Sequence, residues 1–229
     1  MRRNARARPR PWQPDWYVLR GLGRAIREAI APLELSGSRV LDYGCGERPY
    51  EAWFRDRGAD YAGADLHGVH EVAIGADGRL AAPDASFDLV ASFQVLEHVW
   101  EVERYLAECH RVLAPGGRLL LSTHGVWLYH PHPEDWRRWT AAGLVREVEA
   151  RGFRLERSWP VAGPLAWALM LPLVGVCHYL RRVPLAGDAL AAALALPTNA
   201  LVALADGLTP RLVTRDNACI YVALFARCA

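Results

Sequence analysis

The sequence predicts an α/β protein built on a doubly wound, mostly parallel β-sheet. Short apolar segments typical of buried strands alternate with segments in which apolar residues recur at helical spacing. A glycine-rich turn, Gly44 to Gly46, follows the first of these strands, as it does at the ligand-binding edge of open α/β sheets. Because an order of strand, turn, helix and strand joins parallel neighbours, we expect one sheet with helices on both faces.

From residue 15 to residue 113 the expected elements alternate between helix and strand. Leu19, Leu22 and Ile26 stand at helical spacing after Asp15, which can cap a helix. The strand candidates are short and rich in valine, leucine and phenylalanine. In chain order we predict a helix over 15–33, strands within 39–46 and 60–66 separated by a helix over 49–57, a strand over 86–93 and a helix over 98–113.

The elements expected after residue 113 end in a strand with no helix behind it. The segment "APGG" (114–117) ends the preceding helix, and a strand follows over 118–124. Thr140 is a suitable N-cap for a helix over 140–151, and a further strand covers 153–159. The segment "NACIYVALFARC" (217–228) must then rejoin the sheet as its last strand after a long connection.

The composition is that of one folded domain in a reducing compartment. Of the 229 residues 52% are hydrophobic, and the formal net charge of +2 is too small to indicate nucleic acid binding by itself. Five arginines fall among prolines in residues 1–13, so we expect a disordered basic arm there and the folded domain over 14–229. Five widely spaced cysteines without a C-x-x-C pair, and no apolar leader, indicate a reduced cytoplasmic protein without disulfides or a thiolate zinc site.

The turn after the first strand, "LDYGCGERPYE", carries the first chemical signal. Gly44 and Gly46 let the chain turn sharply and let a ligand approach the backbone. Asp65 lies where a carboxylate commonly meets a ribose diol, and Asp42 suits a cationic group better than a phosphate. Pro49 replaces the third glycine of a dinucleotide motif, which disfavours a pyrophosphate. We therefore expect a nucleotide-like ligand with positive charge, and the alternative is a structural turn without a ligand.

Four segments in order resemble the class I S-adenosylmethionine-dependent methyltransferases of the type 11 kind. They are "VLDYGCG", "GADL", "ADGRLAAPDASFDLVASFQVLEHV" and "RVLAPGGRLLLSTH", and the resemblance covers residues 39–153. It implies a seven-stranded sheet with a reversed last strand, S-adenosylmethionine as cofactor, and methyl transfer to a hydroxyl, amine or carbon. A sulfonium methyl is already activated, so this chemistry requires alignment of a nucleophile and no metal.

The same resemblance implies roles for individual residues at the cofactor site. Asp42, Gly44 and Gly46 would hold the methionine end of the cofactor, and Asp65 would bind the ribose hydroxyls. The adenine would lie against Asp77 and Gly78, and Gln94 would face the cofactor where the acceptor arrives.

The segment "HGVWLYHPHPEDWRRWT", which we call the His/Trp loop (residues 124–140), joins a strand end to a helix start. Open α/β sheets place their ligand crevice at such a position, so we expect the loop to line the acceptor pocket. In several methyltransferases of this family a similar stretch accompanies sugar, lipid or natural-product acceptors. The expected acceptor-binding residues are Tyr129, His132, Asp135, Trp136, Arg138 and Trp139.

Three other functions of the His/Trp loop remain as alternatives. A metal would need His124, His130 and His132 to converge with Asp135, yet Pro131 and Pro133 hold the chain extended and send successive side chains apart. Nucleic acid recognition is weakened by the neighbouring acidic residues. The third alternative is a loop whose tryptophans only cover the core.

The general base that removes a proton from the group to be methylated is expected among four residues. Histidine titrates near neutral pH, which favours His124 and His130 in the His/Trp loop. Glu97 and His98 directly follow the fourth strand of the family pattern and are the rivals. His98 has the further alternative of a residue that only packs at the start of a helix.

An apolar insertion over 161–214 precedes the last strand. Residues 158–180 and 189–205 carry no formal charge, but three prolines lie in the first run and Arg181 and Arg182 stand between the two. Spanning a membrane twice would place these arginines on its far side, so we expect a helical cap, a homodimer surface or a helix in the membrane interface.

The sequence therefore predicts a methyltransferase that is cytoplasmic or bound to the inner face of a membrane. Its acceptor would be a small molecule, a sugar or a lipid-linked compound, and nucleic acid is disfavoured. The rival hypothesis is a catalytically inert protein of the same fold that acts by contact.

Overall fold

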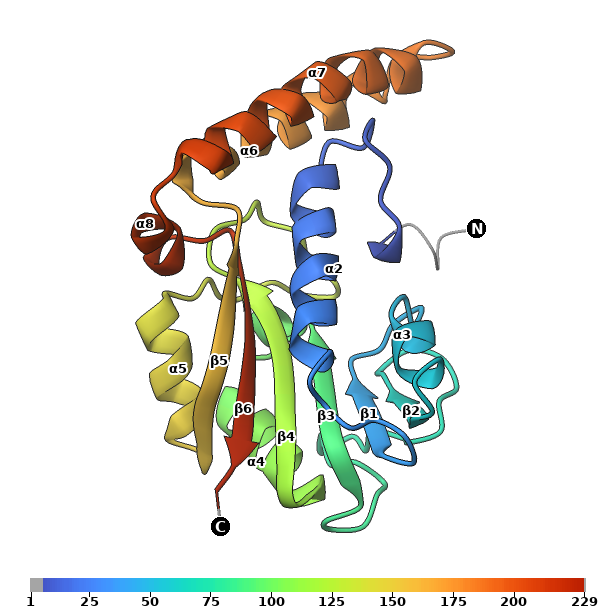
Figure 1. Ribbon diagram of the computed structural model, residues 1–229. Coiled ribbons are helices and arrows are strands. Elements are labelled where there is room, and N and C mark those ends of the chain that lie inside the picture. The colour runs from blue at the N-terminus through green and yellow to red at the C-terminus, as the bar shows by residue number, and fades with distance from the viewer. Residues whose placement is uncertain (1–5, 229) are drawn as a thin grey trace.

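The computed structural model describes residues 6–228 and contains one mixed β-sheet with helices on both faces (Figure 1). The strand order is β2-β1-β3-β4-β6-β5, in which β1 to β4 pair in parallel and β6 runs antiparallel to both of its neighbours. The predicted reversed last strand is confirmed. The strands are β1 (Arg39–Tyr43), β2 (Asp60–Ala64), β3 (Phe87–Phe93), β4 (Leu113–His124), β5 (Phe153–Val161) and β6 (Ile220–Arg227).

The expected count of seven strands is wrong, because the described residues form six. The missing strand would lie in the segment of the sequence that joins β2 to β3, where Ile74 and Leu80 make an isolated bridge. Gly75 begins a tight turn there, since its N–H donates to the carbonyl of Arg79 and its own carbonyl accepts from Gly78. The turn uses the backbone groups that a strand beside β2 would need.

The helices pack on the sheet through two apolar cores. Leu22 and Ile26 of α2 fill the core on one face, and Leu106 of α4 and Leu144 of α5 fill the core on the other. Thr140 caps α5 as predicted, because its Oγ1 accepts the N–H of Gly143 at 3.0 Å. The helices are α2 (Trp16–Ile30), α3 (Glu51–Arg55), the 3-10 turn η1 (Leu96–His98), α4 (Val102–Val112), α5 (Ala141–Glu149), α6 (Pro164–Leu180), α7 (Gly187–Leu208) and α8 (Arg211–Asp216).

Helix α4 begins four residues after its predicted start at His98. Residues 96–98 form only the turn η1, and Val99 is extended. The carbonyl of Glu97 accepts the N–H groups of Trp136 and Arg137, so the His/Trp loop takes the contact that a continuing helix would have used. A tertiary contact thus overrides the local helical pattern.

The insertion folds as two long helices, α6 and α7, which lie side by side across one end of the molecule (Figure 1). A Cβ added at Gly187 would lie 2.5 Å from the carbonyl oxygen of Leu180, so glycine lets the second helix begin close to the first. This α6–α7 hairpin covers the end of the sheet at which the parallel strand β4 finishes.

Polar side chains of α7 attach the hairpin to the domain. The carboxylate of Asp206 accepts the N–H of Gly163 at 2.7 Å and the hydroxyl of Tyr17 at 2.8 Å. Two turns earlier, the buried Asn199 donates to the carbonyls of Pro11 and Gln13. Part of the predicted disordered arm therefore lies against α7, and residues 1–5 of that arm lie outside the described residues.

We expect Asp206→Ala to lower the free energy of unfolding by about 2 kcal/mol, because it leaves the N–H of Gly163 and the hydroxyl of Tyr17 without their acceptor. Asp188→Ala, an exposed aspartate in the first turn of the same helix, is the matched control and should change it by less than about 1 kcal/mol. Urea denaturation measures both, and equal effects would contradict the anchoring role of Asp206.

Candidate functional site

The glycine turn after β1 lies beside the end of β2, and its two glycines serve different purposes. At Gly44 a Cβ would lie 2.4 Å from the side chain of Val95, so this glycine is needed for the loop after β3 to pack. At Gly46 no described atom lies within 4 Å of the position of a Cβ. Both have positive φ, and Gly46 leaves open space at the turn that a ligand can fill.

Two carboxylates lie at this turn. Asp65 accepts the N–H of Gly46 at 2.9 Å and the N–H of His67 at 3.0 Å. Asp42 is buried and accepts the hydroxyl of Tyr61 at 2.6 Å. Burial raises the pKa of Asp42 to about 7, and a cationic group bound beside it would favour its ionised form. The open space at Gly46 and these two acids fit the aminoacyl and ribose parts of S-adenosylmethionine.

The carboxylate of Asp77, predicted to contact adenine, already has partners in its own loop and in α4. Asp77 accepts the N–H of Arg79 at 3.1 Å, and its carboxylate lies 3.7 Å from the guanidinium of Arg104. Tyr43 donates to the carbonyl of Gly78 at 3.3 Å, which holds this loop against the end of β1. The role of Asp77 and Gly78 at an adenine stays a prediction.

Gln94 connects the ends of β3 and β4. Its side-chain amide donates to the hydroxyl of Ser122 at 3.0 Å, and its φ of +58° places it in the left-handed region. A non-glycine residue held in this conformation marks a position that the surrounding contacts over-determine. It lies at the carboxyl end of a parallel strand, as the predicted contact with cofactor and acceptor requires.

Glu97, His124 and His130 form a compact cluster at the ends of β3 and β4, with one ligand-type atom of each within 4.8 Å of the others. The side chain of Glu97 is 0% exposed. Its Oε2 accepts the hydroxyl of Thr123 at 2.9 Å, and its Oε1 lies 3.3 Å from Nε2 of His124. The loop thus folds back although Pro131 and Pro133 were expected to send its side chains apart.

Burial keeps the imidazoles of this cluster uncharged. Desolvation lowers the pKa of His124 to about 2, and it also lowers the pKa of His130 and of His98. The same cause raises the pKa of Glu97 to about 7. At neutral pH the cluster therefore combines neutral histidines with an acid that readily gains or loses its proton.

His98 lies at the side of the cluster. Its Nε2 is 4.0 Å from Oε1 of Glu97, its Nδ1 bonds to the carbonyl of Glu134, and its ring centroid is 5.0 Å from that of His130. The structure thus brings together all four predicted proton acceptors, which come from η1, the end of β4 and the His/Trp loop.

An ion pair shapes the His/Trp loop. The guanidinium of Arg138 binds both carboxylate oxygens of Asp135, at 2.6 and 2.7 Å, and holds the pKa of that carboxyl far below its usual range. Asp135 also accepts the N–H of His130 at 2.9 Å, and the N–H of Trp139 donates to the carbonyl of His124. Asp135, Arg138 and Trp139 therefore hold the loop that carries His130.

The remaining predicted acceptor-binding residues lie toward the surface. Tyr129 is 76% exposed, and His132 is exposed with its ring centroid 6.4 Å from that of His130. Trp136 packs on Trp100 with ring centroids 4.8 Å apart. The structure does not bring Tyr129 or His132 into the cluster.

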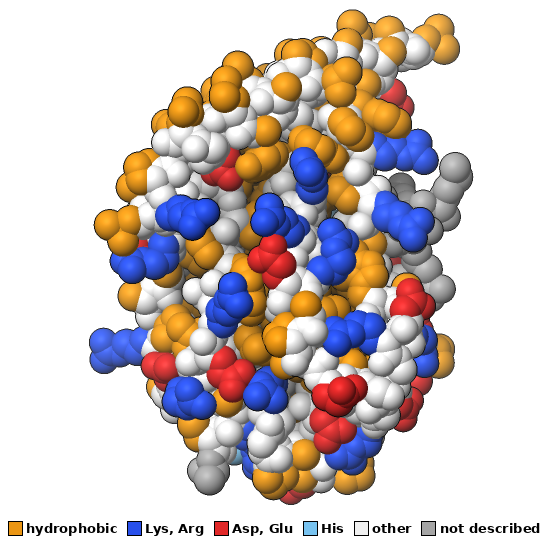
Figure 2. Space-filling model, in the orientation of Figure 1, with side chains coloured by type: hydrophobic (Ala, Val, Ile, Leu, Met, Phe, Trp, Pro, Cys, Tyr) orange, Lys and Arg blue, Asp and Glu red, His pale blue; other side chains and the backbone are white. Residues whose placement is uncertain are grey.

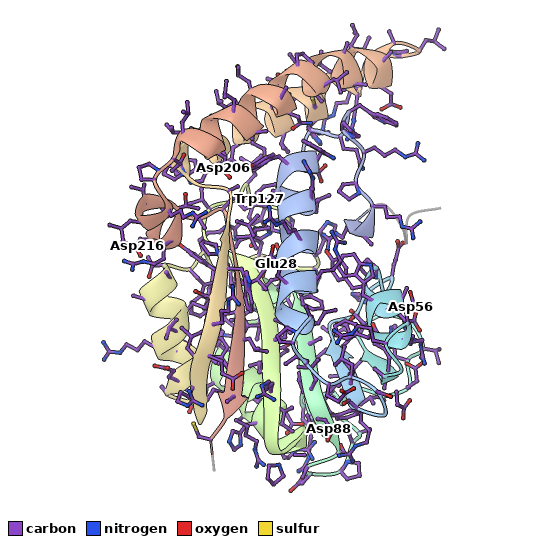
Figure 3. All side chains as sticks on the ribbon, in the orientation of Figure 1. Glu28, Asp56, Asp88, Trp127, Asp206 and Asp216 are labelled. Atoms are coloured by element: carbon purple, nitrogen blue, oxygen red, sulfur yellow. The ribbon has the colours of Figure 1, made fainter. Side chains whose placement is uncertain are left out.

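Trp127, which the sequence did not single out, joins the cluster to the α6–α7 hairpin. Its ring stacks on His124 at 5.1 Å between centroids, and the planes differ by 9°. It also lines a cavity of about 380 Å³ together with Val174, His178, Arg181 and Arg182. Figure 3 shows Trp127 beneath the hairpin. Its position three residues after His124, at a strand end, was the available signal.

Thr123 and Trp100 were also missed. Thr123 donates to Glu97, and Trp100 packs on Trp136. Neither residue type stands out in a buried strand or a connecting loop, so their roles depend on tertiary contacts that the sequence pattern does not contain.

Comparison with known proteins matches this geometry to one family. A family model described as a methyltransferase domain, Methyltransf_23, matches residues 16–158. A probable S-adenosylmethionine-dependent methyltransferase of Mycolicibacterium smegmatis is 35% identical over 138 residues, 53% of this chain and 54% of that protein. A ubiquinone biosynthesis O-methyltransferase of Cereibacter sphaeroides is 35% identical over 129 residues, 49% of this chain and 52% of that protein. The chain thus spans about half the length of these curated relatives.

Solved structures agree on the fold. An S-adenosylmethionine-dependent methyltransferase from Mesorhizobium loti aligns with a TM-score of 0.56 at 18% identity, covering 90% of this chain and 98% of that one. The 1,6-didemethyltoxoflavin-N1-methyltransferase of Burkholderia thailandensis, solved with S-adenosylhomocysteine, aligns with a TM-score of 0.54 at 17% identity, covering 99% and 80%. With a matching family model over most of the sheet and a glycine turn that fits the cofactor, the chain belongs to the class I S-adenosylmethionine-dependent methyltransferases.

Proposed function

We propose that this methyltransferase transfers a methyl group to a hydroxyl oxygen of an apolar or lipid-linked small molecule presented at a membrane surface. The observation that carries the proposal is the α6–α7 hairpin, which exposes many apolar side chains and lies at the same end of the sheet as the Glu97 cluster. The relatives named as ubiquinone biosynthesis O-methyltransferases support oxygen as the acceptor atom.

On the cofactor side, the residues of the glycine turn would hold S-adenosylmethionine. Asp42 would favour the ammonium group of its methionine part, and Asp65 would accept hydrogen bonds from ribose hydroxyls. Gly46 keeps the approach to the backbone open. When bound, the cofactor supplies a methyl group activated by the positive sulfur.

On the acceptor side, a hydroxyl must lose its proton as it becomes a nucleophile. The cluster of Glu97, His124 and His130 lies at the neighbouring strand ends and has an acid whose pKa is near 7. His130 is the most exposed member, with 22% of its side chain accessible, so an acceptor would meet the cluster there.

The hairpin presents two parallel apolar stripes to its surroundings. Helix α7 is the one described helix that is long and apolar enough to cross a membrane. Both Asn199 and Asp206 of this helix bond to the domain, which supports an interfacial position over a spanning one. The outward stripes are Leu190, Leu194, Leu201, Leu204 and Leu208 on α7 and Leu165, Leu169, Val176 and Tyr179 on α6.

Charge next to the hairpin favours an anionic surface. Arg181 and Arg182 lie exposed in the turn between the two helices, and Arg6, Arg8 and Arg10 of the N-terminal segment are exposed as well. Figure 2 shows hydrophobic side chains along the upper edge of the molecule with arginines below them. An interfacial helix pair flanked by arginines binds anionic lipid through both apolar burial and charge.

The cofactor site is tested by substitution. We expect Asp65→Ala to raise the Kd for S-adenosylmethionine about 10- to 100-fold, because charge-assisted hydrogen bonds to the ribose are lost. His130→Ala is the control and should leave this Kd nearly unchanged while lowering turnover. Titration calorimetry measures both. Unchanged affinity in Asp65→Ala would refute the ribose contact.

The acceptor class is tested with methyl-labelled S-adenosylmethionine and a cell extract separated into lipids, glycans and water-soluble small molecules. We expect label in the lipid fraction, as a methyl ether that survives mild alkali, and much less of it with His130→Ala. Label found only in glycans or on amines would exclude the proposed acceptor.

The membrane contact is tested by sedimentation with vesicles of phosphatidylglycerol and phosphatidylcholine. The wild type should pellet at low salt and be partly released as salt screens the arginines. The double variant Leu201→Glu, Leu204→Glu should reduce partitioning at least about tenfold, because two apolar contacts become charged. Val69→Glu, an exposed loop position, is the matched control. A dimer by light scattering without vesicle binding would assign the hairpin to a second copy of the chain.

A further inference from the structure

We propose that Glu97, His124 and His130 form a binding site for one divalent transition-metal ion, and that Zn²⁺ suits the site best. One carboxylate and two imidazoles are the donor set of many catalytic zinc sites, which keep a further position open. The proposal goes beyond methyl transfer, because a sulfonium methyl needs no metal, and it does not depend on the identity of the acceptor.

The spacing of the donor atoms matches such a site. Two donors at 2.0 to 2.2 Å from a shared tetrahedral zinc ion lie about 3.4 Å apart. The distance between Nε2 of His124 and Oε1 of Glu97 is 3.3 Å, and the donor atom of His130 lies within 4.8 Å of both. His130, with 22% of its side chain accessible, is the most exposed of the three and is the ligand that would have to move when an ion binds.

A buried carboxylate oxygen at the cluster lacks a partner among the described residues, and this second observation points to a ligand. Oε1 of Glu97 accepts no hydrogen bond from the residues that the structure describes, although Nε2 of His124 lies beside it. A buried carboxylate oxygen without a hydrogen bond is costly, and a cation between it and the imidazole would remove that cost.

Neighbouring groups already orient two of the three ligands, Glu97 and His130. Thr123 donates to the other oxygen of Glu97, which directs Oε1 toward His124. Nδ1 of His130 lies 3.0 Å from the carbonyl of Leu128 and 3.3 Å from the carboxylate of Asp135, so its Nε2 is left to bind an ion. Such outer contacts are the usual support of histidine ligands.

A metal here would also act on the acceptor, a consequence that rests on the proposed function. A hydroxyl oxygen bound in the open position would release its proton to water at a lower pH than the free hydroxyl. The resulting oxyanion is the nucleophile that methyl transfer requires.

The test uses the full chain, purified with a chelator and dialysed, and titrated with Zn²⁺ by calorimetry and with Co²⁺ by visible absorption. The wild type should bind one ion per chain, with Co²⁺ bands typical of a low-coordinate site. His130→Ala should weaken binding at least about 100-fold. His132→Ala, in the same loop but outside the cluster, is the matched control and should bind as the wild type does.

His130→Ala is the decisive variant, because His124 and Glu97 are buried and their substitution also disturbs the core. The affinity of each variant for S-adenosylmethionine, measured in parallel, reports whether the fold is intact. One ion bound without turnover on lipids would leave the metal site standing and refute the proposed function. A wild type that binds neither ion, or a His130→Ala variant that binds as tightly as the wild type, would overturn the metal site.

Discussion

The burial of Glu97 is the constraint on which the functional end of the molecule depends. Its carboxylate accepts the hydroxyl of Thr123 in β4, and its backbone carbonyl accepts two N–H groups of the His/Trp loop. Glu97, which lies in the turn after β3, thus connects a neighbouring strand and a distant loop. The loop that bonds to this carbonyl closes over the buried carboxyl, and this closure places His130 beside His124.

The topology of the sheet decides where the insertion lies. Strand β5 runs parallel to β4 and ends at the functional edge, and β6 runs in the opposite direction between them. The chain that joins β5 to β6 must therefore leave and return at the edge where the parallel strands end. The long connection at this point in the sequence therefore covers the end of the sheet that carries the Glu97 cluster.

Local sequence patterns correctly predicted the helices and strands that depend on residues close together in the sequence. The N-cap at Thr140 needs one hydroxyl near one free N–H, and β6 is a continuous apolar segment between polar ends. The start of α4 and the absent seventh strand were mispredicted for another reason. In both places, contacts with other residues take the backbone groups that the regular element would have used.

The candidate site was predictable as a set of residues and less so as an arrangement. Glu97 and His98 lie shortly after β3, His124 ends β4 and His130 lies in the loop that follows, all places that the order of elements locates. Their convergence depends on the ion pair of Asp135 with Arg138, which turns the His/Trp loop back despite its prolines. Trp127 escaped prediction because its partners, His124 and the cavity beneath the hairpin, exist only in the folded chain.

The pairing of Val161 with Ile220 has a consequence for how such a protein can diversify. These residues pair in adjacent antiparallel strands at the two ends of the insertion, so the whole insertion is the connection of one β-hairpin. Its length and composition can change without altering the register of the sheet or the glycine turn after β1. If the hairpin recognises the acceptor as proposed, acceptor recognition and cofactor binding lie in separable parts of one domain, and a new hairpin grafted at this junction would give the same domain a different range of acceptors.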